Sequence, residues 1–127
     1  MKTLADLPAA RPIARRPLLE AEIQDRCVEW MRARGYWARK FSSISQRSVP
    51  DYLFAKEEDL GFRAALKIAT EFKREDAPIR TDTGCMSTPA QVDEQTAMRN
   101  AGWIVFESND VEGFKKEILE IEAAYAI

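Results

Sequence analysis

Residues 62–73 read FRAALKIATEFK, and this stretch decides the fold. In a β-strand, alternate side chains point to opposite faces of the sheet. One face of this stretch carries side chains suited to a core, namely Leu66, Ile68, Thr70 and Phe72. The other face carries Lys67, Ala69, Glu71 and Lys73. We therefore predict a strand at 62–73 that is buried on one face and presents a carboxylate beside an ammonium group on the other.

The residues that precede this strand predict one helix and two further strands. Apolar side chains spaced by three and four residues are typical of an amphipathic helix at 18–34, and Gly35 stands where such a helix would end. The aromatic-rich stretch 36–42 favours a strand, followed by a polar turn. Pro50 then introduces a short strand at 51–55.

The residues that follow predict a loop at 74–86, a helix, a strand and a closing helix. Thr88 before Pro89 is the pattern of a helix N-cap with proline at the first helical position. That helix should reach about Asn100, and a strand at 103–107 and a helix at 111–125 should follow. The predicted order is α-β-β-β-α-β-α, an α/β fold with a central mixed sheet flanked by helices.

Length and composition suit one domain. The chain has 127 residues, of which 46% are hydrophobic and 31% charged, so we expect a single domain at 18–127. Residues 1–17 hold three prolines among scattered arginines and predict a flexible arm. No apolar run approaches a membrane span or the core of a signal peptide. We therefore expect no membrane partner and a cytoplasmic location.

The residue types that are missing restrict the chemistry. The sequence has no histidine, and its two cysteines lie far apart without CxxC spacing. Histidine-based hydrolysis, Ser-His-Asp triads, nucleophilic Cys-His pairs and most catalytic zinc sites are thereby excluded. Residues 1–50 carry ten Lys/Arg and five Asp/Glu, a balance of +5, whereas the remaining residues carry nine and sixteen, a balance of −7. A phosphate-binding surface drawn from the first half is compatible with this asymmetry, and so are solvated helix faces.

Asp51, Glu71 and Lys73 are the candidate catalytic residues. Glu71 and Lys73 share a strand face, although such a pair alone is common on solvent-facing strands. If the strand at 51–55 pairs antiparallel with the strand at 62–73, Asp51 lies near Glu71, although an isolated aspartate after proline also suits a turn cap. Two adjacent carboxylates repel each other unless a cation separates them, and a hard divalent ion prefers oxygen ligands. Lys73 would then orient the attacking water or neutralise developing charge.

Three short motifs in order resemble those of a known nuclease family. Pro50-Asp51, Glu71-Phe72-Lys73 and Ser87-Thr88-Pro89-Ala90-Gln91 together are similar to the PD-(D/E)xK nuclease superfamily, and more closely to its VRR-NUC branch, which occurs in phage proteins and in a eukaryotic DNA-repair nuclease. The resemblance spans about residues 18–121 and implies a restriction-endonuclease-like core. Ser48 departs from the family pattern, which often has glycine two residues before the proline.

The resemblance implies a role for each matching residue. Asp51 and Glu71 become metal ligands, with the backbone carbonyl of Phe72 as a further ligand. Lys73 becomes the catalytic lysine, and Gln91 matches a glutamine that supports the site.

The resemblance also implies an acidic residue on the first helix. Glu20 is preferred because it stands four residues before Gln24, as in the family pattern ExxIQ, and Glu22 is the alternative. The contact of this residue with the metal would be direct or indirect.

The function that the resemblance implies is a Mg²⁺- or Mn²⁺-dependent DNA endonuclease that cuts branched DNA such as Holliday junctions or flaps. Homodimerisation and a phage or bacterial host cytoplasm are expected with it. Two other hypotheses stay open: a catalytically inactive nuclease fold that binds DNA, and a protein-interaction module in which Glu71 and Lys73 form a surface ion pair.

Several other residues have no settled role. Arg74 and Arg80 in the predicted loop either contact DNA phosphates or are solvated, and Cys85 is unassigned. The three tryptophans are expected to serve the core or a subunit interface, rather than base stacking.

Overall fold

The computed structural model describes residues 15–41, 48–57 and 65–126 of the chain. The elements are α1 (Glu20–Ala33), β1 (Trp37–Lys40), β2 (Tyr52–Lys56), β3 (Leu66–Phe72), α2 (Pro89–Asn100), β4 (Ile104–Ser108) and α3 (Val111–Tyr125). The predicted order α-β-β-β-α-β-α is confirmed.

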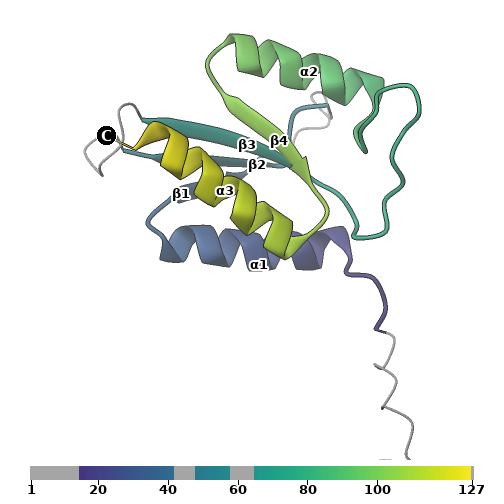
Figure 1. The fold of residues 1–127 in the computed structure, drawn as a ribbon, viewed down its shortest axis with the longest axis horizontal. Helices are drawn as coiled ribbons and strands as arrows, with labels where there is room; N and C mark the ends of the chain where they lie inside the picture. The colour runs from purple at the N-terminus through teal and green to yellow at the C-terminus, as the bar shows by residue number, and fades with distance from the viewer. Residues whose placement is uncertain (1–14, 42–47, 58–64, 127) are drawn as a thin grey trace, which may run out of the picture.

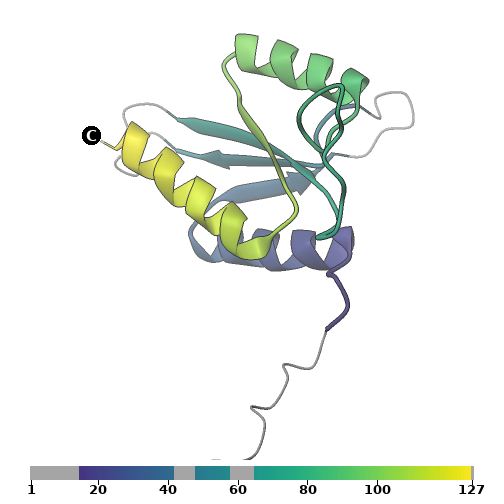
Figure 2. The same ribbon diagram turned by 45° about the vertical axis from the view of Figure 1, so that its right-hand side comes forward.

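The four strands form one mixed sheet in the order β1-β2-β3-β4. The first two pairings are antiparallel, and β3 pairs parallel with β4 after the chain crosses over through α2. Figure 1 shows α1 and α3 against one side of the sheet and α2 on the other, and Figure 2 shows the same layers from a second direction. The predicted mixed sheet flanked by helices is therefore confirmed.

The core lies between the sheet and the two helices α1 and α3. The side chains of β3 predicted to face inward, Leu66, Ile68, Thr70 and Phe72, are at most 1% exposed. They meet apolar side chains of both helices, among them Ile23, Met31, Phe114 and Ile118. Burial of this face fixes the strand register, because a slip of one residue would turn these side chains to the other face.

The predicted element ends need small corrections. The central strand was predicted at 62–73 and runs over Leu66–Phe72, with residues 62–64 outside the described part. The pairing with β2 ends before Lys73, whose amide instead donates to Ser108 O of β4. Gly35 and Gly102 follow α1 and α2 with φ of 90° and 97°, a conformation that glycine adopts without a steric penalty.

The predicted arm is described only at its end. Residues 1–14 lie outside the described part, whereas Arg15 forms an ion pair with Glu75 at 2.9 Å. Among the described helices, none has the length and hydropathy that a membrane span requires.

Candidate active site

The candidate residues gather at one end of the sheet. Asp51 immediately precedes β2, Glu71 lies near the end of β3, and Lys73 directly follows β3. Glu20 is the first residue of α1, and Gln91 lies in the first turn of α2. Figure 1 shows that both helices begin at this same end of the sheet. The fold therefore brings residues as far apart in the sequence as Glu20 and Gln91 into one site.

Asp51 is anchored to β3 rather than left as a simple turn cap. Its Oδ2 accepts a hydrogen bond of 3.0 Å from the backbone N–H of Phe72. The neighbouring residue Tyr52 pairs with Thr70, so Asp51 lies opposite Glu71 when the register is continued by one residue. The antiparallel pairing predicted from the sequence is confirmed, and it brings the two carboxylates together.

Gln91 links Glu71 and Lys73. Its amide Nε2 donates to Glu71 Oε1 at 3.0 Å, and its Oε1 accepts from Lys73 Nζ at 2.9 Å. Lys73 Nζ is also 3.5 Å from Glu71 Oε1. The same Gln91 oxygen accepts from Thr88 N at 2.8 Å, while Thr88 Oγ1 accepts from Gln91 N. The glutamine of a helix capping box therefore also holds the lysine and the carboxylate.

Glu20 and Glu22 differ in their surroundings. Burial and the nearby charge of Asp51 raise the pKa of Glu20, and Glu20 Oε1 accepts from Gln24 Nε2 at 3.2 Å. Glu22 instead forms an ion pair with Arg16 at 2.6 Å and accepts from Leu19 N at 3.0 Å. The structure thus brings Glu20 to the site and places Glu22 in the cap of α1.

Glu20, Asp51 and Glu71 form what we call the carboxylate cluster. Burial is the main cause that raises the pKa of all three groups. The charge of Asp51 further raises the pKa of Glu20 and that of Glu71, which reaches about 8. Lys73 opposes the rise of all three pKa values and Lys40 that of Glu20 and Asp51, yet the pKa values stay raised. Full ionisation of the three groups is therefore unfavourable, and a bound cation would favour it.

One oxygen of Glu71 has no partner. Three buried side-chain polar atoms of the described residues lack a hydrogen bond: Arg34 Nε, Thr70 Oγ1 and Glu71 Oε2. An unsatisfied carboxylate oxygen is costly to bury, because it loses its contacts with water. Within the described residues, no three His, Cys, Asp or Glu side chains already stand in a metal-binding arrangement. Mg²⁺ commonly uses only one or two carboxylates together with water and substrate phosphate oxygens, and Asp51 and Glu71 suit that donor set.

A cleft of about 360 Å³ opens beside this site. Its walls include Glu20 and Lys73 together with residues of the following loop, Arg74, Asp76, Ala77 and Pro78. Arg74 and Arg80 each pair with a carboxylate of the same loop, Asp76 at 3.3 Å and Asp82 at 3.2 Å. The loop is therefore held partly by its own ion pairs where it borders the site.

Glu107 is a supporting residue that the sequence reasoning missed. Its carboxylate accepts hydrogen bonds from Met86 N at 2.9 Å, Ser87 N at 2.9 Å and Ser87 Oγ at 2.7 Å. Gln95 Nε2 donates to Ser87 Oγ at 3.0 Å. These contacts bind the residues just before α2 to β4, and so they fix the helix turn that carries Gln91. No sequence pattern names the partner of Glu107, since the contact joins residues twenty positions apart.

We expect Glu107→Ala to lower the free energy of unfolding of the protein. The substitution leaves three donors near the start of α2 without an acceptor, and each unsatisfied buried donor costs about 1–3 kcal/mol. Urea unfolding monitored by circular dichroism measures the change in free energy. Glu107→Gln, which keeps one acceptor oxygen, should lose less than Glu107→Ala, and equal stability of both variants and the wild type would contradict the role assigned to Glu107.

The raised pKa of Glu71 predicts how stability depends on pH without metal ions. The folded state holds a proton on Glu71 up to about pH 8, whereas the unfolded state releases it near the ordinary value of 4.5. The folded state therefore binds more protons between these values, and stability falls as pH rises through them. The pKa of Glu71 differs by more than one unit between the folded and unfolded states, so the free energy of unfolding should fall by more than about 1.4 kcal/mol across this pH range. For this domain that corresponds to a fall in Tm of about 4 °C or more.

Melting curves in EDTA from about pH 5.5 to about pH 8.5 test this prediction. Glu71→Gln should show a clearly flatter dependence than the wild type. An equally steep fall in that variant would show that another group titrates.

The assignment of these site residues rests on their geometry, because comparisons with known proteins give no match. No family model matches the sequence, and no significant match was found among curated proteins or solved structures. The backbone amide of Phe72 donates a hydrogen bond to Asp51. The role of the Phe72 carbonyl as a metal ligand stays a prediction.

Proposed function

We propose that this chain is a divalent-metal-dependent DNA endonuclease of the VRR-NUC type, with Mg²⁺ or Mn²⁺ at the carboxylate cluster. The observation that carries the proposal is the buried Glu71 carboxylate, whose Oε2 has no partner while its Oε1 is shared by Lys73 and Gln91. Asp51 supplies a second carboxylate beside it. Such a group of acidic oxygens with one ammonium suits metal-assisted phosphodiester hydrolysis.

Each side chain has a distinct role in this proposal. Asp51 and Glu71 hold the ion, with the Phe72 carbonyl as a further ligand and Glu20 acting directly or through a water. When bound, the ion polarises the phosphate and lowers the pKa of a water molecule. Lys73 neutralises the charge that develops on the phosphate oxygens in the transition state. Gln91 holds the Lys73 ammonium and the Glu71 carboxylate next to each other through its two hydrogen bonds.

The cleft beside the site suits a phosphodiester substrate. Lys73 and Arg74 line it together with Glu20 and Asp76, and Arg74 pairs with Asp76. A backbone phosphate entering there would therefore meet Lys73 next to the carboxylate cluster. Branched or flapped DNA is the substrate class that the family resemblance suggests, and a homodimer in a phage or host cytoplasm belongs to the same proposal.

Cleavage assays test the proposal. Purified protein is incubated with four-way, flap and linear duplex DNA in the presence of Mn²⁺, Mg²⁺ or EDTA. We expect cleavage with either ion and none in EDTA, and loss of cleavage in Asp51→Asn. Cleavage that persists in EDTA or in Asp51→Asn would contradict the assignment. Absence of cleavage of every substrate with both ions would favour the inactive or interaction-module hypotheses.

A further inference from the structure

The strand register places two rows of side chains beside the carboxylate cluster on the side of the sheet away from α1 and α3. Directly opposite residues in neighbouring strands share a face of the sheet. The row nearer the cluster contains Arg39 and Leu53, which pair with each other, and Ala69. The next row contains Trp37, Ala55 and Lys67, which are likewise paired across three strands. We call Trp37, Arg39, Leu53, Ala55 and Lys67 the open face.

The open face is accessible although it lies within a sheet. Trp37 is 48% exposed, Arg39 and Lys67 are exposed, and Leu53 and Ala55 are half-buried. In contrast, Ala69 of β3 and Val105 of β4, which lie on the same side of the sheet, are buried. The contacts of α2 are with β4, so this helix covers the β4 side of the sheet and leaves the β1 and β2 side accessible.

Trp37 is exposed and lies outside the core, one of the two roles expected for the tryptophans, whereas its exposure is compatible with the other, a subunit interface. Trp30 does pack against the core, where its ring meets Phe114 with centroids 6.4 Å apart. Trp37 instead lies at the start of the edge strand, and Arg39 is stacked over its ring at 5.2 Å. An exposed aromatic ring can stack on a nucleobase, and a cation beside it can contact the phosphate backbone.

A hollow of about 420 Å³ adjoins the Trp37 ring. Trp37, Ala55 and Lys67 line it together with Lys56, Glu57, Ala65 and Leu66. Of the two lysines in that lining, Lys56 pairs with Glu122 at 3.7 Å, and Glu57 is the one carboxylate. Among the described residues, neither Arg39 nor Lys67 forms an ion pair. The hollow therefore combines an apolar floor and an aromatic wall with Lys67, a cation outside the ion pairs of the described residues.

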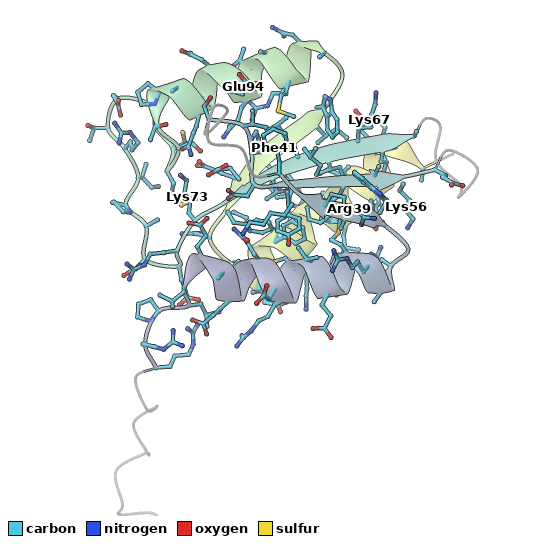
Figure 3. The ribbon with its side chains drawn as sticks, turned by 180° about the vertical axis from the view of Figure 1, so that it is seen from behind. Arg39, Phe41, Lys56, Lys67, Lys73 and Glu94 are labelled. Carbon is cyan, nitrogen blue, oxygen red and sulfur yellow. The ribbon has the colours of Figure 1, made fainter. Side chains whose placement is uncertain are left out.

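The open face is continuous with the candidate active site. Asp51 and Ala55 are four residues apart along the chain, which in an extended strand is about 13 Å. A stacked single strand of DNA rises about 3.4 Å per nucleotide, so about four nucleotides cover that distance. Figure 3 shows Lys73 at the cluster end of the sheet and Lys67 towards the opposite end. A strand whose phosphate reaches Lys73 can thus extend over Arg39 to Lys67.

From these observations we propose that the open face binds a single-stranded segment of DNA that leads into the carboxylate cluster. Trp37 stacks on a base in the hollow, while Arg39 and Lys67 contact backbone phosphates. This inference rests on the proposed nuclease function, because the bound strand is proposed to lead into the nuclease active site. It makes the substrate class more specific: DNA with an unpaired strand next to the cleaved bond.

Binding experiments without metal test this inference separately from cleavage. The fluorescence anisotropy of fluorescein-labelled oligothymidylate and of a labelled blunt hairpin duplex is measured in EDTA with the full-length protein. We expect Trp37→Ala to weaken oligothymidylate binding about fivefold or more, and Trp37→Phe to weaken it less, because phenylalanine retains a stacking surface. Hairpin binding should change less than twofold. Circular dichroism melting confirms that each variant is folded.

The salt dependence tests the two cations. Each lost phosphate contact should reduce the slope of log K against log salt concentration by about 0.7 for a single strand. We expect that reduction for Arg39→Ala and for Lys67→Ala, and none for Lys116→Ala, an exposed lysine of α3 that serves as the matched control.

The outcomes separate the two proposals. If Trp37→Ala binds oligothymidylate within twofold of the wild type, or loses hairpin binding to the same extent, the single-strand assignment is wrong, whatever the cleavage assays give. If the variants show the expected losses but no DNA is cleaved with Mg²⁺ or Mn²⁺, the open face is a single-strand site and the nuclease function is overturned.

Discussion

We expect replacement of Lys73 with alanine to lower kcat for the proposed metal-dependent DNA cleavage by about 10²- to 10³-fold, which is the usual effect of removing one group that stabilises transition-state charge. The reason lies in the position of its ammonium group, 2.9 Å from Gln91 Oε1 and 3.5 Å from Glu71 Oε1. These contacts hold the ammonium group in the wall of the cleft that a phosphate would enter. Single-turnover cleavage of a labelled DNA flap in Mn²⁺ measures the effect.

The binding of Mn²⁺ separates this role from a structural one. Lys73 is not a proposed metal ligand, and removing its charge leaves the carboxylate cluster more negative. Lys73→Ala should therefore bind Mn²⁺ at least as tightly as the wild type in isothermal titration, although it cleaves poorly. Lys116→Ala is the matched control and should cleave normally. If Lys73→Ala keeps wild-type kcat, the lysine has no part in the chemistry.

Glu71→Gln should abolish both Mn²⁺ binding and Mn²⁺-dependent cleavage. The wild-type carboxylate is 4% exposed and has an oxygen without a partner, so an ion at that oxygen stabilises the folded state over the unfolded one. At a free ion concentration of 100 Kd the gain is about 2.7 kcal/mol. For a domain of this size it corresponds to a rise in Tm on the order of 10 °C.

Differential scanning fluorimetry with and without Mn²⁺ measures this rise. We expect it in the wild type and in Glu94→Gln, a carboxylate of α2 outside the cluster, and not in Glu71→Gln. In EDTA at about pH 8.5, Glu71→Gln should melt above the wild type, because the neutral amide avoids the cost of a buried charge. An undiminished Mn²⁺ effect in Glu71→Gln would place the ion elsewhere.

The sequence predicted the parts of the site that depend on local pattern. Alternation in 62–73 put Glu71 and Lys73 together, and antiparallel pairing of that strand with 51–55 put Asp51 beside them. The N-cap at Thr88 was likewise predicted, and the spacing from Thr88 to Gln91 is that of a capping box, which signals that Gln91 turns back towards the start of its helix.

The parts that depend on packing could not be predicted in the same way. Glu20 and Glu22 both occupy the first turn of α1, and only the docking of that helix turns Glu20 towards Asp51. The contact of Glu107 with Ser87 joins β4 to the residues before α2, and no periodic pattern in the sequence predicts it. Trp37 is exposed because α2 covers the other half of its sheet face, and no local pattern specifies where a crossover helix packs.

Asp51 and Glu71 are proposed to form a site for one divalent cation. Soaking a crystal of the protein with Mn²⁺ tests this site through the anomalous scattering of the metal. We expect an anomalous peak about 2.1 Å from Glu71 Oε2 and within ligand distance of Asp51, with Glu20 on the same side. A fully soaked crystal without a peak at Glu71, or with its only peak at other residues such as Glu22, would contradict the proposal.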